Sequence, residues 1–131
     1  MADTSLIKKL GIKPGQKLLI LNAPDGYLAT LGTLPEGAEV KTNADGTFDL
    51  VQIFLYNKAD VDRYGPMAIQ AVKQGGLLWF TYPKKTSKIK SDITRDIGWE
   101  SVRTMDWRPV TQIAIDETWS ALRFRPESEV K

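Results

Sequence analysis

The 131-residue chain contains no cysteine and no histidine. Without cysteine it can form no disulfide, no thiolate nucleophile and no thiolate-bound metal site. Without histidine it lacks the commonest general base at neutral pH and the commonest zinc ligand. Ser-His-Asp catalysis and histidine-ligated zinc are therefore excluded, and acid–base chemistry could come only from Asp, Glu, Lys or Tyr.

Long apolar runs and a large excess of charge are also missing. The longest apolar runs, such as Leu18–Leu21 and Leu77–Phe80, are far shorter than the about 20 residues of a membrane span. Residues 1–10 are interrupted by Lys8 and Lys9 and do not have the pattern of a signal peptide. The formal net charge of +2 is too small to indicate a nucleic-acid partner. We expect a cytoplasmic protein that contacts neither membranes nor nucleic acid.

The composition is that of one globular domain. The chain is 42% hydrophobic and 26% charged, and its length is close to the commonest domain size. We therefore expect residues 1–131 to form a single domain with one core.

Continuous apolar runs predict strands that are buried on both faces, as in a parallel sheet. Helices are predicted where a capping residue precedes a periodic apolar segment that ends at glycine. Asp60 is the expected cap of the long helix, and Pro66 inside that helix indicates either a later start or a kink. The predicted strands span residues 17–21, 38–41, 48–56, 77–82, 110–115 and 118–125, and the predicted helices span 5–10, 27–31, 60–73 and 92–97.

Strands and helices alternate along most of the chain, and a hairpin closes it at Asp116-Glu117. This order predicts an α/β fold of three layers, with helices on both faces of a mostly parallel sheet of about six strands. One strand, at residues 118–125, is expected to be antiparallel to the others.

Four segments resemble the core of the class I S-adenosylmethionine-dependent methyltransferases. Residues 13–20 (KPGQKLLI) are similar to the entry to the first strand of that family, and residues 48–51 (FDLV) to its fourth strand. Residues 72–78 (VKQGGLL) are similar to the step into its fifth strand, and residues 98–102 (GWESV) to its closing segment. The resemblance covers most of the chain and implies a truncated, methyltransferase-like (Rossmann-like) domain.

The chain departs from that family where the cofactor is held. The family ends its first strand with an acidic residue and a glycine-rich turn, whereas residues 20–26 read ILNAPDG, of which only the last fits. Pro24 removes an N–H and fixes φ where the turn must bend. The acid that binds ribose is missing at residues 41–43, with Asp45 the nearest candidate, and the segment up to Phe48 is too short for another helix and strand. We therefore expect no cofactor.

The chain also resembles, more narrowly, a bacterial family of short, uncharacterised, degenerate methyltransferase-like domains. The likeness lies in residues 82–84 (YPK), 91–96 (SDITRD) and 116–126 (DETWSALRFRP). This resemblance implies a fold and no activity.

Ligands of open α/β sheets bind beyond the carboxyl ends of the strands, where several polar loops of this chain should meet. Lys84 and Lys85, together with free amides at the start of the predicted helix 92–97, favour a small anion at this edge. Ordinary solvated loops are the alternative. The candidate ligand-binding residues are Asn22, Asp25, Asn57, Tyr82, Lys84, Lys85, Asp92, Asp116 and Trp119.

Four tryptophans have different expected surroundings. Trp79 is predicted in the core, and Trp99 is predicted to pack against the sheet. Trp107 is the one most expected to be exposed, and Trp119 could flank a pocket near the hairpin tip.

The favoured function is a non-enzymatic domain that binds a small anion or a protein partner on a scaffold that has lost the S-adenosylmethionine site. One alternative is a small enzyme with a rebuilt site, using Lys84, Asp25, Asp92 or Tyr82. Another is a divergent methyltransferase with an unusual loop. The sequence assigns no catalytic residue and no metal ligand.

Overall fold

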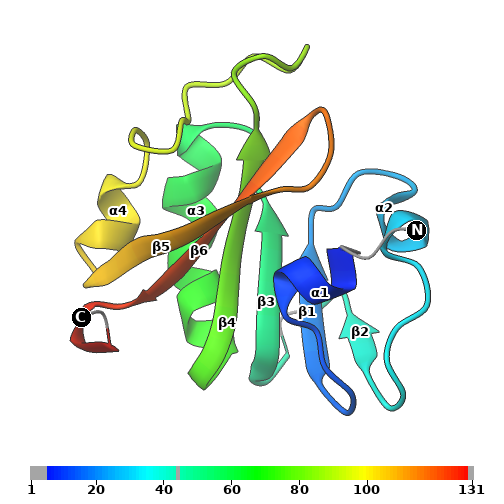
Figure 1. The fold of residues 1–131 in the computed structure, drawn as a ribbon. Helices are drawn as coiled ribbons and strands as arrows, with labels where there is room; N and C mark the ends of the chain where they lie inside the picture. The colour runs from blue at the N-terminus through cyan, green and yellow to red at the C-terminus, as the bar shows by residue number, and fades with distance from the viewer. Residues whose placement is uncertain (1–5, 44, 130–131) are drawn as a thin grey trace.

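The computed structural model describes residues 6–43 and 45–129, which form a six-stranded sheet with helices on both of its faces (Figure 1). Ser5, the expected first residue of the first helix, lies outside the described residues. The elements in chain order are α1 (Leu6–Leu10), β1 (Lys17–Leu21), α2 (Tyr27–Leu31), β2 (Glu39–Lys41), β3 (Phe48–Phe54), α3 (Lys58–Ala71), β4 (Val72–Pro83), α4 (Glu100–Arg103), β5 (Trp107–Ala114), β6 (Trp119–Pro126) and the 3-10 turn Glu127–Glu129.

The strands lie in the order β2-β1-β3-β4-β6-β5. The four strands from β2 to β4 are parallel to one another, whereas β6 is antiparallel to both of its neighbours, β4 and β5. The predicted mostly parallel sheet with one antiparallel strand is therefore confirmed. The chain passes from β2 to β3 through residues 42–47 without a further described helix or strand, as the short spacing indicated.

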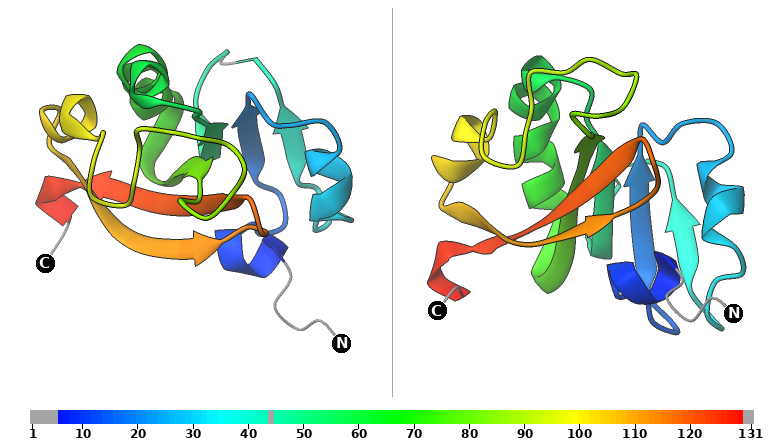
Figure 2. Two further views of the ribbon diagram at one scale, coloured as in Figure 1. Left: turned by 90° about the horizontal axis from the view of Figure 1, so that it is seen from above. Right: turned by 45° about the horizontal axis from the view of Figure 1, so that its top comes forward.

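Each face of the sheet is covered by its own hydrophobic cluster, which gives the three predicted layers (Figure 2). On the first, called here the α3 face, Val61 and Ala68 of α3 and Val102 of α4 pack on the sheet. On the second, called the α1 face, Leu10 of α1 and Leu31 of α2 do the same. Alternation along the strands supplies both clusters, because successive side chains point to opposite faces.

The longest described helix, α3, begins at a different residue from the one expected. Asn57 is its cap, with the side-chain oxygen accepting a hydrogen bond from Asp60 N at 2.9 Å. The Asp60 carboxylate instead accepts from Tyr56 N at 2.9 Å, so the expectation that Asp60 is the cap was wrong. The helix also runs through Pro66 rather than starting there.

Two further expectations about local structure were wrong. Residues 92–97 form bends and not a helix, and the helix that follows, α4, begins later, at Glu100. Hydroxyl groups explain this, because Ser91 Oγ accepts from Ile93 N and Thr94 Oγ1 accepts from Ile97 N, and these local bonds compete with helical ones. The helix predicted at residues 60–73 also ends earlier than expected, because Val72 and Lys73 belong to β4.

Among the described helices, including the 14 residues of α3, none has the length and apolar character that crossing a bilayer requires.

A carboxylate fastens the amino-terminal ends of three strands. Asp49 of β3 accepts a hydrogen bond from Lys17 N at the start of β1 at 2.7 Å, and it forms an ion pair with Lys73 of β4. The backbone bond from Lys17 and the bond from Lys73 hold the pKa of Asp49 below its ordinary value.

We predict that Asp49→Asn lowers the free energy of unfolding at pH 7 by about 1–2 kcal/mol, because an ionised acceptor of two donors is lost. Since the folded pKa is depressed, the contribution is present above the ordinary value of 3.8 and disappears as the pH falls below it. Urea unfolding between pH 7 and pH 3 measures both effects. Asp45→Asn is the matched control, since the Asp45 side chain is exposed. Equal stability of the two variants at pH 7 would contradict the prediction.

Candidate functional site

Eight of the nine candidate residues lie where β1, β3 and β4 end or where the β5–β6 hairpin turns (Figure 1). The ninth, Asp92, lies in the loop between β4 and α4 and bonds to Lys58 at the start of α3. The register places the hairpin at the end of β4, because Trp119 of β6 pairs with Pro83, the last residue of β4. The structure does not gather the nine residues into one site. Tyr82, Lys84 and Lys85 line one pocket, Asn22 and Asp25 line another, and the remaining four have structural contacts.

The first pocket, called here the β4 pocket, has a volume of about 410 Å³. Strand β4 supplies Tyr82, and the loop after β4 supplies two lysines. The bend before α4 contributes Arg95 and Asp96, which are not among the nine candidate residues. Its lining residues are Tyr82, Lys84, Lys85, Thr86, Thr94, Arg95, Asp96, Gln112 and Ser120.

Strand pairing builds the floor of the β4 pocket. Tyr82 lies opposite Ser120 in the β4–β6 ladder, so both side chains point to the same face of the sheet. Gln112, from β5, donates a hydrogen bond from Nε2 to the Tyr82 hydroxyl at 2.8 Å. Lys84 continues the ladder, because its N–H donates to Thr118 O at 2.8 Å. The first lysine is therefore fixed to the hairpin by its backbone.

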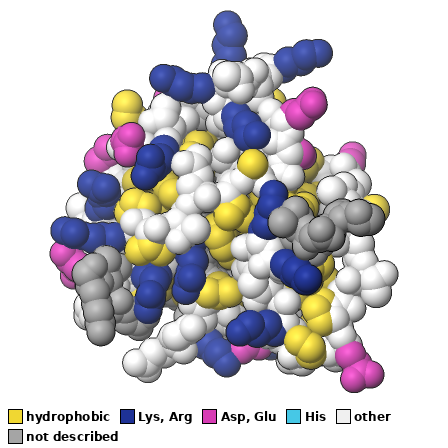
Figure 3. All heavy atoms as spheres, viewed as in Figure 1, with side chains coloured by type: hydrophobic (Ala, Val, Ile, Leu, Met, Phe, Trp, Pro, Cys, Tyr) yellow, Lys and Arg dark blue, Asp and Glu magenta, His cyan; other side chains and the backbone are white. Residues whose placement is uncertain are grey.

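The loop after β4 carries several lysines beyond the end of the sheet. In Figure 3, Lys or Arg side chains project at the top of the molecule, where Figure 1 shows this loop. Ser87 closes a turn in the loop, since its hydroxyl donates to Lys84 O at 2.8 Å. The lysines of this loop therefore lie on a turn that a hydrogen bond holds in place, and not on an extended tail.

The expected helix start at Ser91-Asp92 does not add to this charge, because residues 92–97 are not helical. The prediction that a helix N-terminus at this position helps to bind an anion was therefore wrong. In its place, Thr94 Oγ1 accepts hydrogen bonds from Asp96 N at 3.2 Å and Ile97 N at 3.1 Å. This turn brings Arg95 and Asp96 to the pocket, and Figure 2 shows the segment crossing above the end of the sheet.

The Tyr82 phenol is buried, with 3% of its surface exposed. Burial raises its pKa; the charge of Arg95 opposes this shift, and that of Asp96 adds to it. Tyr82 therefore enters the β4 pocket as a neutral hydroxyl at physiological pH, able to donate one hydrogen bond.

The second pocket, called here the β1 pocket, has a volume of about 440 Å³ and lies at the end of β1. Residues 20–29 line it together with Thr42, and among these described residues Asp25 alone is charged. The turn contains Pro24, which has no N–H, and Asn22 at a positive φ of 58°. The Asn22 amide is directed back to the protein, with Nδ2 lying 3.5 Å from Phe54 O.

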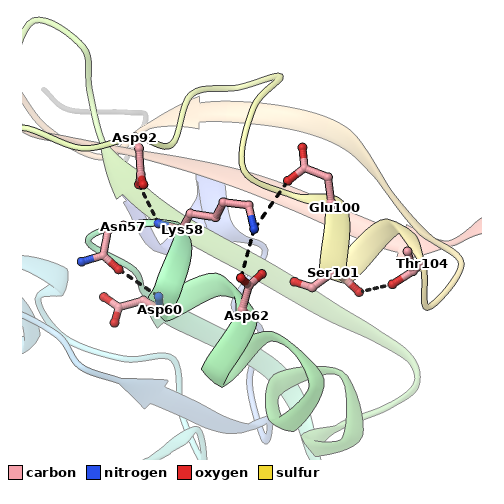
Figure 4. A network of polar contacts seen from close by, with 8 residues as sticks. All are labelled: Asn57, Lys58, Asp60, Asp62, Asp92, Glu100, Ser101 and Thr104. Carbon is pink, nitrogen blue, oxygen red and sulfur yellow. Dashed lines mark hydrogen bonds and ion pairs between the residues drawn. The ribbon is translucent and has the colours of Figure 1, made fainter.

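Two of the predicted site residues, Asn57 and Asp92, stabilise the start of α3 (Figure 4). Asn57 caps the helix, and Asp92 Oδ1 accepts a hydrogen bond from Lys58 N at 2.7 Å. The Lys58 ammonium pairs with Asp62 at 3.0 Å and with Glu100 of α4 at 4.0 Å. These groups connect the loop before α4 to the helices and do not line either pocket.

The hairpin tip uses the other two predicted residues. Asp116 Oδ1 accepts hydrogen bonds from Thr118 N and Trp119 N, each at 2.8 Å, and so closes the turn. Trp119 is buried, with its ring edge-on to Phe54 at 5.0 Å and to Tyr56 at 5.1 Å. Trp119 lines neither the β4 pocket nor the β1 pocket.

The remaining tryptophans follow the expectations in part. Trp79 is buried and donates its indole N–H to Leu10 O at 3.0 Å. Trp99 is buried and stacks on Phe80 with ring centroids 5.7 Å apart. Trp107 is half-buried against the cluster of the α3 face rather than exposed.

A buried polar chain beneath the β1 pocket escaped the sequence analysis. The Tyr27 hydroxyl donates to Gln52 Oε1 at 2.8 Å, and Gln52 Nε2 donates to Thr81 Oγ1 at 3.0 Å. Gln52 lies in β3, the central run of apolar residues, and is fully buried. Burial, opposed by the bond to Gln52 and reinforced by the charge of Asp116, raises the pKa of Tyr27 to about 12.

In the parts of the chain that the structure describes, no group of three or more acidic side chains is placed to hold a metal ion.

No protein-family model matches the chain, and no curated protein matches it in sequence. Solved structures do match it in fold. Ribosomal protein L11 methylase from Lactobacillus delbrueckii subsp. bulgaricus has a TM-score of 0.63 at 11% identity, over 92% of this chain and 74% of that one. DhpI, in its SAH complex, has a TM-score of 0.59 at 14% identity, over 93% and 82%. TrmN from Thermus thermophilus has a TM-score of 0.62 at 9% identity, over 92% and 47%.

These likenesses define the class of fold. The chain has the methyltransferase-like, Rossmann-like α/β fold that class I methyltransferases share. At such low identity the likeness concerns the fold alone, so the function has to be argued from the site.

We predict that Tyr27→Phe lowers the free energy of unfolding at pH 7 by about 1–3 kcal/mol, because the buried Gln52 oxygen loses its donor. In the wild-type protein, stability should also fall between pH 10 and pH 12, since the unfolded phenol ionises near 10.0 and the folded one near 12. The variant should lose this part of the alkaline dependence. Chemical unfolding at pH 7, 10 and 11.5 is the measurement, with Tyr56→Phe as the control; an unchanged alkaline slope in Tyr27→Phe would refute the assignment.

Proposed function

We propose that this chain is a non-enzymatic ligand-binding domain that takes a small anionic ligand in the β4 pocket. The observation that carries the proposal is the meeting of Lys84, Lys85 and Arg95 over a floor of buried hydroxyl groups. Three cations from two separate segments surround one concave volume. Such a site favours negative charge and supplies hydrogen-bond donors that fix its position.

The fold is that of a family that binds S-adenosylmethionine. The β1 pocket lies at the turn after the first strand, where that family holds the cofactor. The residues there do not fit the cofactor as the resemblance implies it is held. Pro24 has no backbone N–H, and the side-chain amide of Asn22 is directed at Phe54 O. Neither β1 nor β2 ends with an acidic residue. We therefore propose that S-adenosylmethionine is not a ligand, and no chemical step is derived through it.

A divergent methyltransferase is the second candidate. The β1 pocket of about 440 Å³ favours it, because a volume of that size follows the first strand of a methyltransferase-like fold. Its lining is nearly uncharged apart from Asp25, which distinguishes it from the cationic β4 pocket.

The two candidates differ in one direct measurement. We predict that calorimetry with S-adenosylmethionine up to about 1 mM detects no binding, because the turn lacks the amide and the acids that the family uses. Denatured protein serves as the control for heats of dilution. A micromolar dissociation constant would favour the divergent methyltransferase instead.

The anion site predicts a response to inorganic phosphate. In NMR titrations at low salt, phosphate should shift the amide signals of residues 82, 84–86, 94–96 and 120, and about 0.15 M salt should weaken the response. Replacing Lys84 and Lys85 together by alanine should reduce the affinity about tenfold or more, because two charge-assisted contacts are lost.

The matched control replaces Lys88 and Lys90 by alanine, since both lie in the same loop but do not line the β4 pocket. This control removes the same charge and should leave the shifts at residues 82 and 84–86 nearly unchanged. An equal loss of phosphate affinity in the two double variants would mean that phosphate responds only to the total charge of the loop and does not bind in the β4 pocket. Shifts confined to the opposite edge, near Pro14, Glu36 and Gln74, would place the site elsewhere.

A further inference from the structure

We infer that the ligand of the β4 pocket is a phosphorylated polyol, a phosphate monoester whose carbon skeleton carries hydroxyl groups, and not a bare anion. The inference rests on the proposed anion site and names its ligand class. The size of the pocket, the hydroxyl groups on its floor and the acceptors beside its cations carry the inference.

The first observation is the size of the pocket. Its volume of about 410 Å³ falls in the range of small-molecule sites, about 300–1,000 Å³. It would hold about a dozen waters of roughly 30 Å³ each, so a single phosphate group leaves most of it to be filled.

The second observation is a pair of buried hydroxyl groups on its floor. Tyr82 and Ser120 are 3% and 6% exposed. The Tyr82 oxygen accepts from Gln112, but within the described residues its own hydrogen has no acceptor. The Ser120 hydroxyl likewise has no side-chain hydrogen bond in the described part of the chain, where it only pairs through its backbone. Both residues line the pocket, so a ligand with polar groups of its own can form hydrogen bonds with their hydroxyl groups.

The third observation is the presence of acceptors beside the cations. Asp96 lines the pocket with a carboxylate, and Gln112 uses its amide nitrogen on Tyr82, which leaves its oxygen as an acceptor. A carboxylate repels a bare anion, but it binds the hydroxyl groups of a polyol as a hydrogen-bond acceptor. The pocket thus has cations for a phosphate, and both donors and acceptors for alcohol groups.

The lysines and the polar groups of the floor come from different parts of the fold, and this separation supports the same ligand class. Lys84 and Lys85 belong to the loop after β4, whereas Tyr82, Ser120 and Gln112 belong to three strands of the sheet. The charged end of a ligand would lie among the loop cations, and its hydroxylated end would lie against the sheet.

The test compares four probes that differ in hydroxyl content on the full chain: inorganic phosphate, propyl phosphate, glycerol 3-phosphate and ribose 5-phosphate. Calorimetry or NMR titration gives their affinities. We expect glycerol 3-phosphate or ribose 5-phosphate to bind about tenfold more tightly than propyl phosphate, a difference of about 1.4 kcal/mol, because their hydroxyl groups add two or more hydrogen bonds.

The discriminating variant is Asp96→Asn. It should raise the affinity for inorganic phosphate by removing repulsion, and it should lower the ratio of polyol phosphate to propyl phosphate severalfold by weakening an acceptor. Glu36→Gln, at the opposite edge, is the matched control for net charge and should change neither quantity. Tyr82→Phe should lower the ratio as well, because it removes one hydroxyl group from the floor of the pocket.

The outcomes separate this inference from the proposed function. Phosphate and polyol phosphates binding equally, with a ratio that Asp96→Asn does not change, would overturn the inference and leave the anion site standing. An absence of binding by all four probes would overturn both.

Discussion

The pairing of β6 with β4 is the interaction on which the rest of the site depends. Because β6 runs antiparallel between β4 and β5, its first residues return to the edge where β4 ends. The bond from Lys84 N to Thr118 O extends the ladder by one step beyond the strand. Backbone hydrogen bonds, and not side-chain chemistry, therefore fix the basic loop next to the hairpin and next to the floor formed by Tyr82 and Ser120.

The centre of the sheet, from which these loops extend, is buried on both faces. Strand β3 is almost entirely buried, and the single polar side chain in its buried half, Gln52, is satisfied by Tyr27 and Thr81. A buried network of this kind links α2, β3 and β4 and disfavours other registers, because any slip would leave polar groups without partners. The α1 face thus combines apolar packing with a specific polar alignment.

The two pockets differ in chemistry although they occupy the same edge. The β1 pocket is nearly neutral and is formed by one continuous turn, whereas the β4 pocket is cationic and is formed by four separate segments. Asn57 and Asp92 lie between loops and helices and hold the start of α3, which keeps the bend before α4 in place. The cationic side chains at this edge therefore gather beyond β4 and not beyond β1.

Local patterns in the sequence determined the fold class and most element positions. Continuous apolar runs marked the strands of the sheet, and the short link at Asp116-Glu117 required a hairpin and hence one antiparallel strand. The same reasoning failed at residues 92–97, because the hydroxyls of Ser91 and Thr94 form local turns that a capping rule does not foresee. It also assigned the nine candidate residues to a single edge of the sheet, because parallel strands end at the same edge whatever their partners are.

Only the tertiary structure decided which of those residues meet. Gln112 contacts Tyr82 across 30 positions and Asp92 contacts Lys58 across 34, and no local pattern encodes such distances. Arg95, Asp96, Gln112 and Ser120 join the β4 pocket because strand pairing and a short turn bring them there. Whether a residue lies at the edge where the parallel strands end follows from hydrophobicity and chain order, which are local properties of the sequence. The composition of a pocket follows from the register and from side-chain direction, which exist only once the sheet has formed.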